Sequence, residues 1–73
     1  MATQIVMDHT GDSRHFFEQD HPKQLAQAER RFNKFIGQGF TAATRTAAGD
    51  LEVIRSFDPT AEETLFYPRL VGG

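Results

Sequence analysis

The stretch PKQLAQAERRFNKFIGQG, residues 22–39, decides the fold because it is the one long stretch of the chain with a helical pattern. Its apolar side chains recur at the spacing of a single helix face: Leu25, Ala28, Phe32, Phe35 and Ile36. The polar side chains expected mostly on the solvated side are Lys23, Gln27, Arg30, Arg31 and Lys34. The pattern predicts one amphipathic helix whose apolar stripe packs against another element.

Both ends of this helix carry boundary signals. At the start, Asp20 or His21 can cap the helix, and Pro22 fits the first turn, where a missing N–H costs nothing. At the other end, Gly37 or Gly39 can take the left-handed conformation that terminates helices.

A β-hairpin is predicted before the helix. Residues 3–8, TQIVMD, are enriched in β-branched residues and predict a strand. Residues 9–13, HTGDS, predict a turn, because Gly11 can adopt positive φ. Residues 14–18, RHFFE, then predict the returning strand.

A second hairpin and a closing strand are predicted after the helix. Residues 39–46 and 51–57 alternate like strands and flank a turn at 47–50, AAGD. Within 51–57, one face of the expected strand carries Leu51, Val53, Arg55 and Phe57. Residues 58–64, DPTAEET, predict a single helical turn with capping residues at its start. Residues 64–71, TLFYPRLV, predict a short apolar strand in which Pro68 must lie at an edge or an end.

This order of elements places the chain in the α+β class, as a ββαββ(β) roll with one amphipathic helix packed on a mixed sheet. The other sheet face is expected to stay largely in water, because the strands alternate with polar residues. With 73 residues the chain is one domain at most. We assign residues 1–68 to the domain and residues 69–73 to an extended tail.

Composition excludes several classes of function. The chain has no cysteine, so it can form neither a disulfide framework nor a thiolate metal site. Its net charge of −2 argues against a nucleic-acid-binding module, which normally carries a basic stripe. No signal peptide or membrane-spanning stretch is recognised, and we expect a cytoplasmic protein that does not bind membranes.

The polar residues of the first hairpin do not form a convincing catalytic or metal site. The spacing of His9, His15 and His21 matches no short metal-binding signature. A serine–histidine–acid trio for acyl transfer could be drawn from Asp8, His9, Ser13 and His15. Such a site also needs an oxyanion hole and a cleft. We therefore expect no metal, no cofactor and no enzymatic activity of the chain itself.

The C-terminal sequence LFYPRLVGG, residues 65–73, favours a different chemistry. Gly72 and Gly73 have no side chains, so they can enter a narrow channel of another protein. The carboxylate of Gly73 then lies beside nothing bulky, and it can be adenylated with ATP and passed to a thiol or an amine. The alternative is a frayed terminus, which is common in small domains.

Taken together, the two ends of the chain resemble the ubiquitin-like β-grasp family. The opening TQIVMDHTGDSRHFFE, residues 3–18, is similar to that family's first hairpin. The ending AEETLFYPRLVGG, residues 61–73, is similar both to the tail of ubiquitin and to that of the sulfur carriers of the molybdopterin synthase small-subunit type. Bacterial ubiquitin-like modifiers form a third branch that the chain resembles.

The resemblance implies a role for each residue of the tail. Gly73 would be adenylated and then converted to a thioester or thiocarboxylate, and Gly72 would line the channel of the activating enzyme. Arg69, Leu70 and Val71 would dock the tail. The implied partners are an adenylating enzyme and a downstream conjugating enzyme or sulfurtransferase, with a target protein in the case of a modifier.

A partner-binding patch is also expected on the sheet, at outward residues of the last strands such as Ile54 and Tyr67. Two other functions stay open at this point. One is a small non-catalytic protein-interaction domain of the same ββαββ order without tail chemistry. The other is a nucleic-acid-binding domain that would use Arg14, Arg30, Arg31 and Arg45, which the acidic net charge opposes.

Overall fold

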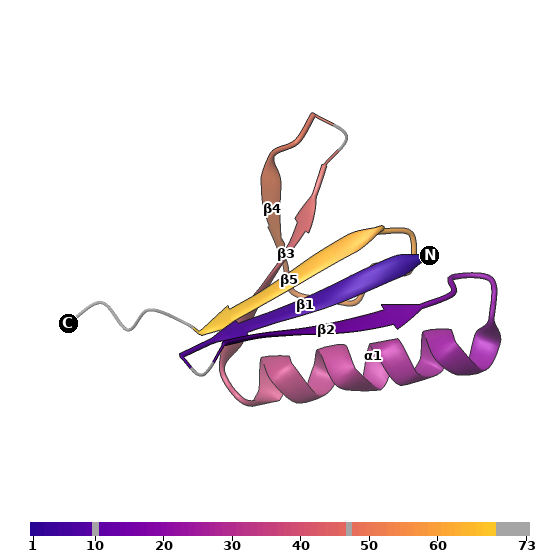
Figure 1. Cartoon of the computed structure of the whole chain (residues 1–73), viewed down its shortest axis with the longest axis horizontal. Helices are drawn as coiled ribbons and strands as arrows, with labels where there is room; N and C mark the ends of the chain where they lie inside the picture. The colour runs from indigo at the N-terminus through magenta and orange to yellow at the C-terminus, as the bar shows by residue number, and fades with distance from the viewer. Residues whose placement is uncertain (10, 47, 69–73) are drawn as a thin grey trace.

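The computed structural model describes residues 1–9, 11–46 and 48–68 and has the expected α+β architecture. One helix and a five-stranded sheet make up this part of the chain (Figure 1). In chain order the elements are β1 (Ala2–Asp8), β2 (Gly11–Phe17), α1 (Pro22–Gly37), β3 (Phe40–Arg45), β4 (Leu51–Ile54) and β5 (Glu63–Pro68).

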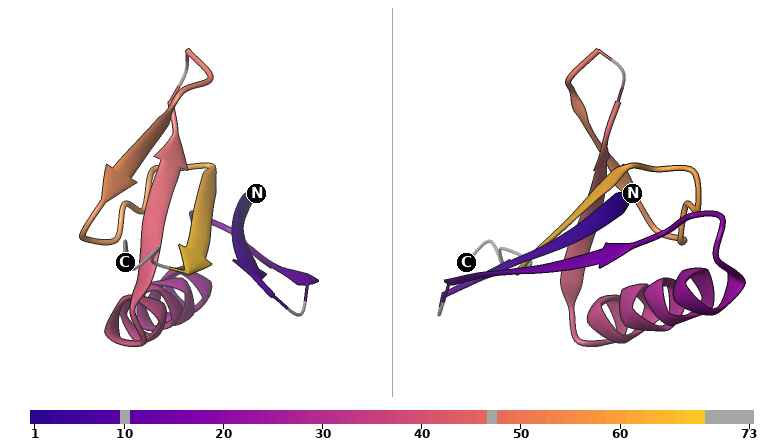
Figure 2. Two further views of the ribbon diagram at one scale, coloured as in Figure 1. Left: turned by 90° about the vertical axis from the view of Figure 1, so that its left-hand side faces the viewer. Right: turned by 45° about the vertical axis from the view of Figure 1, so that its right-hand side comes forward.

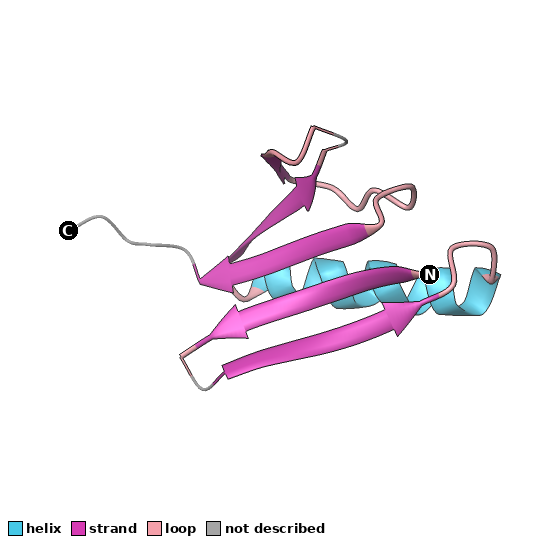
Figure 3. Cartoon of the chain, turned by 45° about the horizontal axis from the view of Figure 1, so that its top comes forward, coloured by secondary structure: helices cyan, strands magenta, loops and turns pink. Residues whose placement is uncertain are grey.

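The sheet is mixed and has the strand order β2-β1-β5-β3-β4, a β-grasp-like topology. The last strand in sequence, β5, is central: it runs parallel to β1 and antiparallel to β3. The remaining pairs, β1 with β2 and β3 with β4, are antiparallel hairpins. The helix covers one face of this sheet, and Figures 2 and 3 show it on that side only.

The hydrophobic core lies between the helix and the covered sheet face. One buried cluster contains Val6, Phe32, Ala42 and Phe66, and a second contains Ala2, Phe17 and Ala28. Phe57 packs against both clusters, with its ring centroid 6.3 Å from that of Phe17 and 5.9 Å from that of Phe32. Both arrangements lie within the usual range of favourable aromatic pairs, so Phe57 joins the two halves of the core.

At each end of the helix, the structure confirms one of the two boundary residues that the sequence predicted. His21 is the N-cap, and its Nδ1 accepts a long hydrogen bond of 3.5 Å from the backbone N–H of Gln24. Pro22 occupies the first turn, as expected. At the C-terminal end Gly39 has a φ of +95°, which makes it the left-handed residue that ends the helix.

Three predicted boundaries were wrong. The first turn is shorter than 9–13, because pairing between β1 and β2 already begins with Asp8 opposite Gly11. The strand predicted over 51–57 ends at Ile54, after which the chain bends and carries Phe57 into the core. Residues 58–64 form no helical turn, and the last of them already belong to β5.

Asp58 explains why this segment becomes a tight turn instead. Its Oδ1 accepts hydrogen bonds from the N–H of Thr60, at 2.9 Å, and from its hydroxyl, at 2.6 Å. The backbone carbonyl of Asp58 accepts a further bond from the N–H of Ala61 at 3.3 Å. These local bonds compete with helix formation, and those from Thr60 hold the pKa of the Asp58 carboxyl below its usual value.

Candidate partner-binding surface

The sheet face opposite the helix, called the open face below, carries an apolar row that crosses the sheet. Strand register places Ile5 beside Leu65, Leu65 beside Ala43, and Ala43 beside Val53. These four residues alternate with the core residues Val6, Phe66 and Ala42 of the same strands, so they lie on the uncovered side. Arg14, the register partner of Ile5, ends the row on β2.

Burial along this row differs between its centre and its ends. Leu65 is 7% exposed and Ala43 is fully buried, although no helix covers them. Val53, on the outer strand β4, is 60% exposed. Two further exposed apolar side chains, Phe16 and Leu51, lie on the same face in the neighbouring register row. The open face is therefore more apolar than the alternation of the strands predicted, and its exposed apolar side chains lie at the two edges, Phe16 on β2 and Leu51 and Val53 on β4.

The two residues proposed for partner contact lie on opposite faces. Tyr67 is half-buried on the open face, beside Thr41 of β3 and two residues after Leu65. Ile54 is half-buried and packs against the core cluster, so the expectation that it points outward was wrong. Its neighbour Val53 occupies the outward position, because successive side chains of a strand point to opposite faces of the sheet. Contact of Tyr67 with a partner stays a prediction.

An ion pair lies at one end of the open face. Arg45 Nε is 3.4 Å from Glu63 Oε1, and the Arg45 guanidinium also donates to the carbonyl of Gly49 at 3.2 Å. Both side chains of the pair are largely solvated, so it contributes little to stability. Its effect is to hold the Arg45 side chain at the margin of the apolar row.

The residues expected to carry the tail chemistry lie outside the described part of the chain: Arg69, Leu70, Val71, Gly72 and Gly73. The structure does show how the segment before them is held. β5 has a strand on each side, and it ends at Pro68 opposite Phe40 of β3. The expected position of Pro68 at a strand end is confirmed. Residues 69–73 therefore follow directly from the central strand of the sheet.

The structure contains a buried polar network that the sequence did not indicate. Gln4 is fully buried on the covered face, where its Nε2 donates to the backbone carbonyl of Ala28 at 3.0 Å. Its Oε1 accepts a 2.7 Å hydrogen bond from Arg31 Nη1. Arg31 was expected mostly in solvent but is half-buried. A signal was present, because Gln4 lies between Ala2 and Val6 on the core-facing positions of β1.

His15 lies beside this network. It is the register partner of Gln4 on β2, and partial burial lowers its pKa, with the nearby Arg31 charge acting in the same direction. His15 lies on strand β2, as predicted, whereas Ser13, which was predicted in the turn, also belongs to this strand. Among residues 1–9, 11–46 and 48–68, no group of three or more His, Cys, Asp or Glu residues could hold a metal ion.

The four arginines considered for nucleic-acid binding do not form one surface. Arg14 and Arg45 lie on the open face, at β2 and β3, whereas Arg30 and Arg31 belong to the helix on the other side. Arg45 and Arg31 are also engaged, with Glu63 and Gln4 respectively. No continuous basic stripe results from this arrangement.

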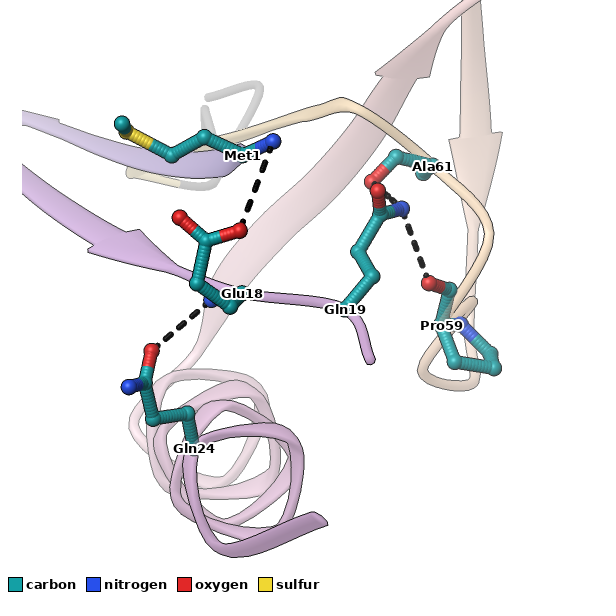
Figure 4. A network of polar contacts seen from close by, with 6 residues as sticks. All are labelled: Met1, Glu18, Gln19, Gln24, Pro59 and Ala61. Atoms are coloured by element: carbon teal, nitrogen blue, oxygen red, sulfur yellow. Dashed lines mark hydrogen bonds and ion pairs between the residues drawn. The ribbon is translucent and has the colours of Figure 1, made fainter. Parts of the chain in front are cut away.

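Polar contacts at the edge of the domain connect the loop after β2 with the loop before β5 (Figure 4). Gln19 Nε2 donates to the carbonyls of Pro59 and Ala61, at 3.0 and 3.3 Å. Nearby, the N–H of Glu18 donates to Gln24 Oε1 at 2.8 Å, and the Glu18 carboxylate lies 3.8 Å from the N-terminal ammonium. These contacts fix the start of β5 relative to the helix.

Open hollows occur among the described residues. One, of about 720 Å³, is lined mainly by polar residues of the β3–β4 hairpin and the 58–63 segment. A second, of about 520 Å³, lies where β3 extends past the end of β4, and a third, of about 300 Å³, lies between Leu25 and Phe57. None of them brings together a nucleophile, a base and an oxyanion donor.

In the described part of the chain, the helix is too short and too polar to cross a membrane. The chain matches no protein-family model, and neither the curated proteins nor the solved structures contain a significant match to it.

Proposed function

We propose that the protein is a ubiquitin-like modifier or carrier, and that a partner enzyme activates the carboxylate of its C-terminal Gly73. The observation that carries the proposal is the position of β5: the strand that precedes RLVGG is the central strand of a β-grasp-like sheet. A segment that follows a strand paired on both sides is firmly anchored at its base. Such an anchor suits a tail that must enter a narrow channel of another protein.

The proposed chemistry proceeds in two steps. The Gly73 carboxylate attacks the α-phosphate of ATP, which forms an acyl-adenylate and releases pyrophosphate. A thiolate or sulfide sulfur then attacks the carbonyl and releases AMP, which leaves a thioester or a thiocarboxylate. All catalytic groups belong to the partner enzyme, and this chain supplies the carboxylate, the narrow Gly72–Gly73 approach and the docking surface.

The apolar row of the open face supports the partner-binding part of the proposal. Leu65 lies on β5, the strand that leads into the tail, and Ala43 on its neighbour β3; both are buried, and the row becomes exposed at Val53. Tyr67 lies on the same face, one residue before the end of β5. An activating enzyme that receives the tail can therefore contact this surface at the same time.

The test is incubation of the protein with ATP and a cognate activating enzyme, followed by intact-mass analysis. The expected products are an adenylate, an enzyme thioester, or an exchange of one carboxylate oxygen for sulfur. The same mass analysis on protein isolated from its own cells should show a chain that ends at Gly73. No product from wild-type protein, with an enzyme active on a known substrate, would refute the proposal.

The same open face also fits the second candidate, a small non-catalytic interaction domain without tail chemistry. Deletion of Gly72 and Gly73 separates the two. A modifier or carrier loses all activation while its thermal unfolding stays unchanged. An interaction domain keeps full partner binding after the deletion.

A further inference from the structure

Strand β4 forms one outer edge of the sheet. It pairs with β3 on one side, and it is the last strand in the order β2-β1-β5-β3-β4 (Figure 2). Its outer side therefore presents backbone N–H and C=O groups that have no strand partner within the sheet. Such an edge is a template for pairing with another chain unless the sequence protects it.

The side chains of β4 protect this edge only in part, because Glu52 is its one charged residue. Leu51 and Val53 both lie on the open face and are 53% and 60% exposed, among the most exposed large apolar side chains described. The strand contains neither lysine nor proline, which are common protective residues. The opposite edge, β2, carries two exposed charged residues, Asp12 and Arg14, against only Glu52 on β4.

We propose that β4 pairs antiparallel with β4 of a second copy of this chain, around a twofold axis that passes through Val53. A twofold axis perpendicular to the sheet places the open faces of both copies on the same side. Successive residues of a strand alternate between the two faces, and residues opposed across the axis share a face. The sequence numbers of two opposed residues must therefore differ by an even number. With Val53 on the axis, Glu52 faces Ile54 of the second copy and Leu51 faces Arg55.

Charge and the length of β4 together select this register over its neighbours. If Glu52 lay on the axis, two carboxylates would face each other directly. If Leu51 lay on the axis, Asp50 would face Glu52 of the second copy. Like charges directly opposite one another destabilise strand pairs, whereas two opposed β-branched side chains stabilise them. An axis at Ile54 opposes no like charges either, but it pairs only Ile54 within β4 and sets Val53 opposite Arg55, beyond the end of the strand. The Val53-centred register opposes no like charges, pairs three residues of β4 and sets valine opposite valine.

The pairing has a consequence for the apolar row. Val53 ends the row on β4, so the row of one copy continues across the axis into the row of the second. The interface is small, because β4 has only four residues. It buries less than the roughly 1,200 Å² of a standard stable interface, and we expect a weak dimer with a dissociation constant between about 10 µM and 1 mM.

Sedimentation at concentrations from about 10 µM to 1 mM tests the pairing. Wild-type protein should shift from monomer toward dimer over this range. Val53→Lys places two ammonium groups opposite each other and should raise the dissociation constant at least about tenfold. Phe16→Lys is the matched control: Phe16 is also 60% exposed on the open face, but on the far edge. A wild type that stays monomeric, or equal effects of both variants, overturns the proposal.

Cysteine substitution tests the register without relying on a loss of association. The chain has no native cysteine, so Val53→Cys introduces a single thiol. On the axis its Cα lies about 4.5–5.5 Å from that of the second copy, within the range a disulfide spans. Leu51→Cys places the two Cα atoms roughly 13 Å apart, four residues out of register. In a glutathione redox buffer Val53→Cys should form covalent dimers and Leu51→Cys should not, and equal yields overturn the register.

Discussion

Arg31 donates a 2.7 Å hydrogen bond to the side-chain carbonyl of Gln4, and so joins the helix to the first strand from within the core. Gln4 is fully buried, and its amide nitrogen bonds the backbone carbonyl of Ala28. Both ends of the amide are therefore satisfied by the helix. A buried amide in this position fixes the rotation of the helix about its axis, because only one orientation presents Arg31 and the Ala28 carbonyl together.

The first prediction concerns this network. Gln4→Ala removes both hydrogen bonds, leaves a cavity and deprives the half-buried Arg31 of its acceptor. We expect the free energy of unfolding to fall by about 2–4 kcal/mol, from the lost bonds and the lost packing. Urea unfolding followed by circular dichroism measures it. Gln27→Ala, at an exposed helix position, is the control and should change it by less than about 0.5 kcal/mol. Equal effects of the two variants would contradict the role of the network.

This network is a part of the fold that the sequence pattern did not predict. The helix over 22–37 was predictable because its apolar residues follow the helical period over four turns. The burial of Gln4 was not predicted, because a polar residue in an alternating strand normally indicates the solvated face, although its position between Ala2 and Val6 was a signal. Likewise, Phe57 was placed on the face of Leu51, since alternation alone does not reveal that the strand ends at Ile54 and the chain bends.

The candidate surface was predictable only in part. Apolar residues on the last strands indicated a patch, and Tyr67 does lie on the open face. The continuous row from Ile5 to Val53 depends on the register of four strands, which are distant in sequence. The parallel pairing of β1 with β5 joins the two ends of the chain, and no local pattern encodes it.

The second prediction concerns His15 and pH. Its pKa lies below the ordinary value of 6.5 because burial disfavours the charged form and Arg31 repels it. The unfolded state therefore takes up the proton first, at a pH near 6.5. Stability is unaffected by His15 well above that pH, and it falls as the pH drops from about 6.5 toward the lower folded-state pKa.

His15→Gln measures this contribution because it removes the titration and keeps a polar side chain. Thermal unfolding between pH 7.5 and pH 5 should show a smaller loss of stability in the variant than in wild type. Ser13→Ala, at an exposed position of the same strand, carries no titrating group; it serves as the control and should follow the wild-type pH profile. A variant of His15 with an unchanged profile would show that the histidine does not contribute.

The third prediction concerns the residue that joins the two core clusters. Phe57→Ala removes the ring that contacts Phe17 and Phe32, so both clusters lose packing at once. Because Phe57 is half-buried, we expect a loss of about 2–3 kcal/mol, below the range for a fully buried phenylalanine. Phe16→Ala, on the exposed edge of the open face, should cost less than about 1 kcal/mol. Denaturant unfolding of the two variants compares them directly, and the reverse order would contradict the bridging role.

The last prediction tests the open face against the proposed activating enzyme. Tyr67→Ala removes a large side chain beside the end of β5 and leaves the sequence from Pro68 to Gly73 unchanged. We expect a KM for activation at least about fivefold higher, with kcat within about twofold of wild type, because docking weakens while the reacting carboxylate is untouched. Pyrophosphate exchange measures both constants. Gln27→Ala, on the solvated side of the helix, should leave both unchanged. If Tyr67→Ala lowered kcat with an unchanged KM, the residue would act on the chemistry of the tail and not on docking.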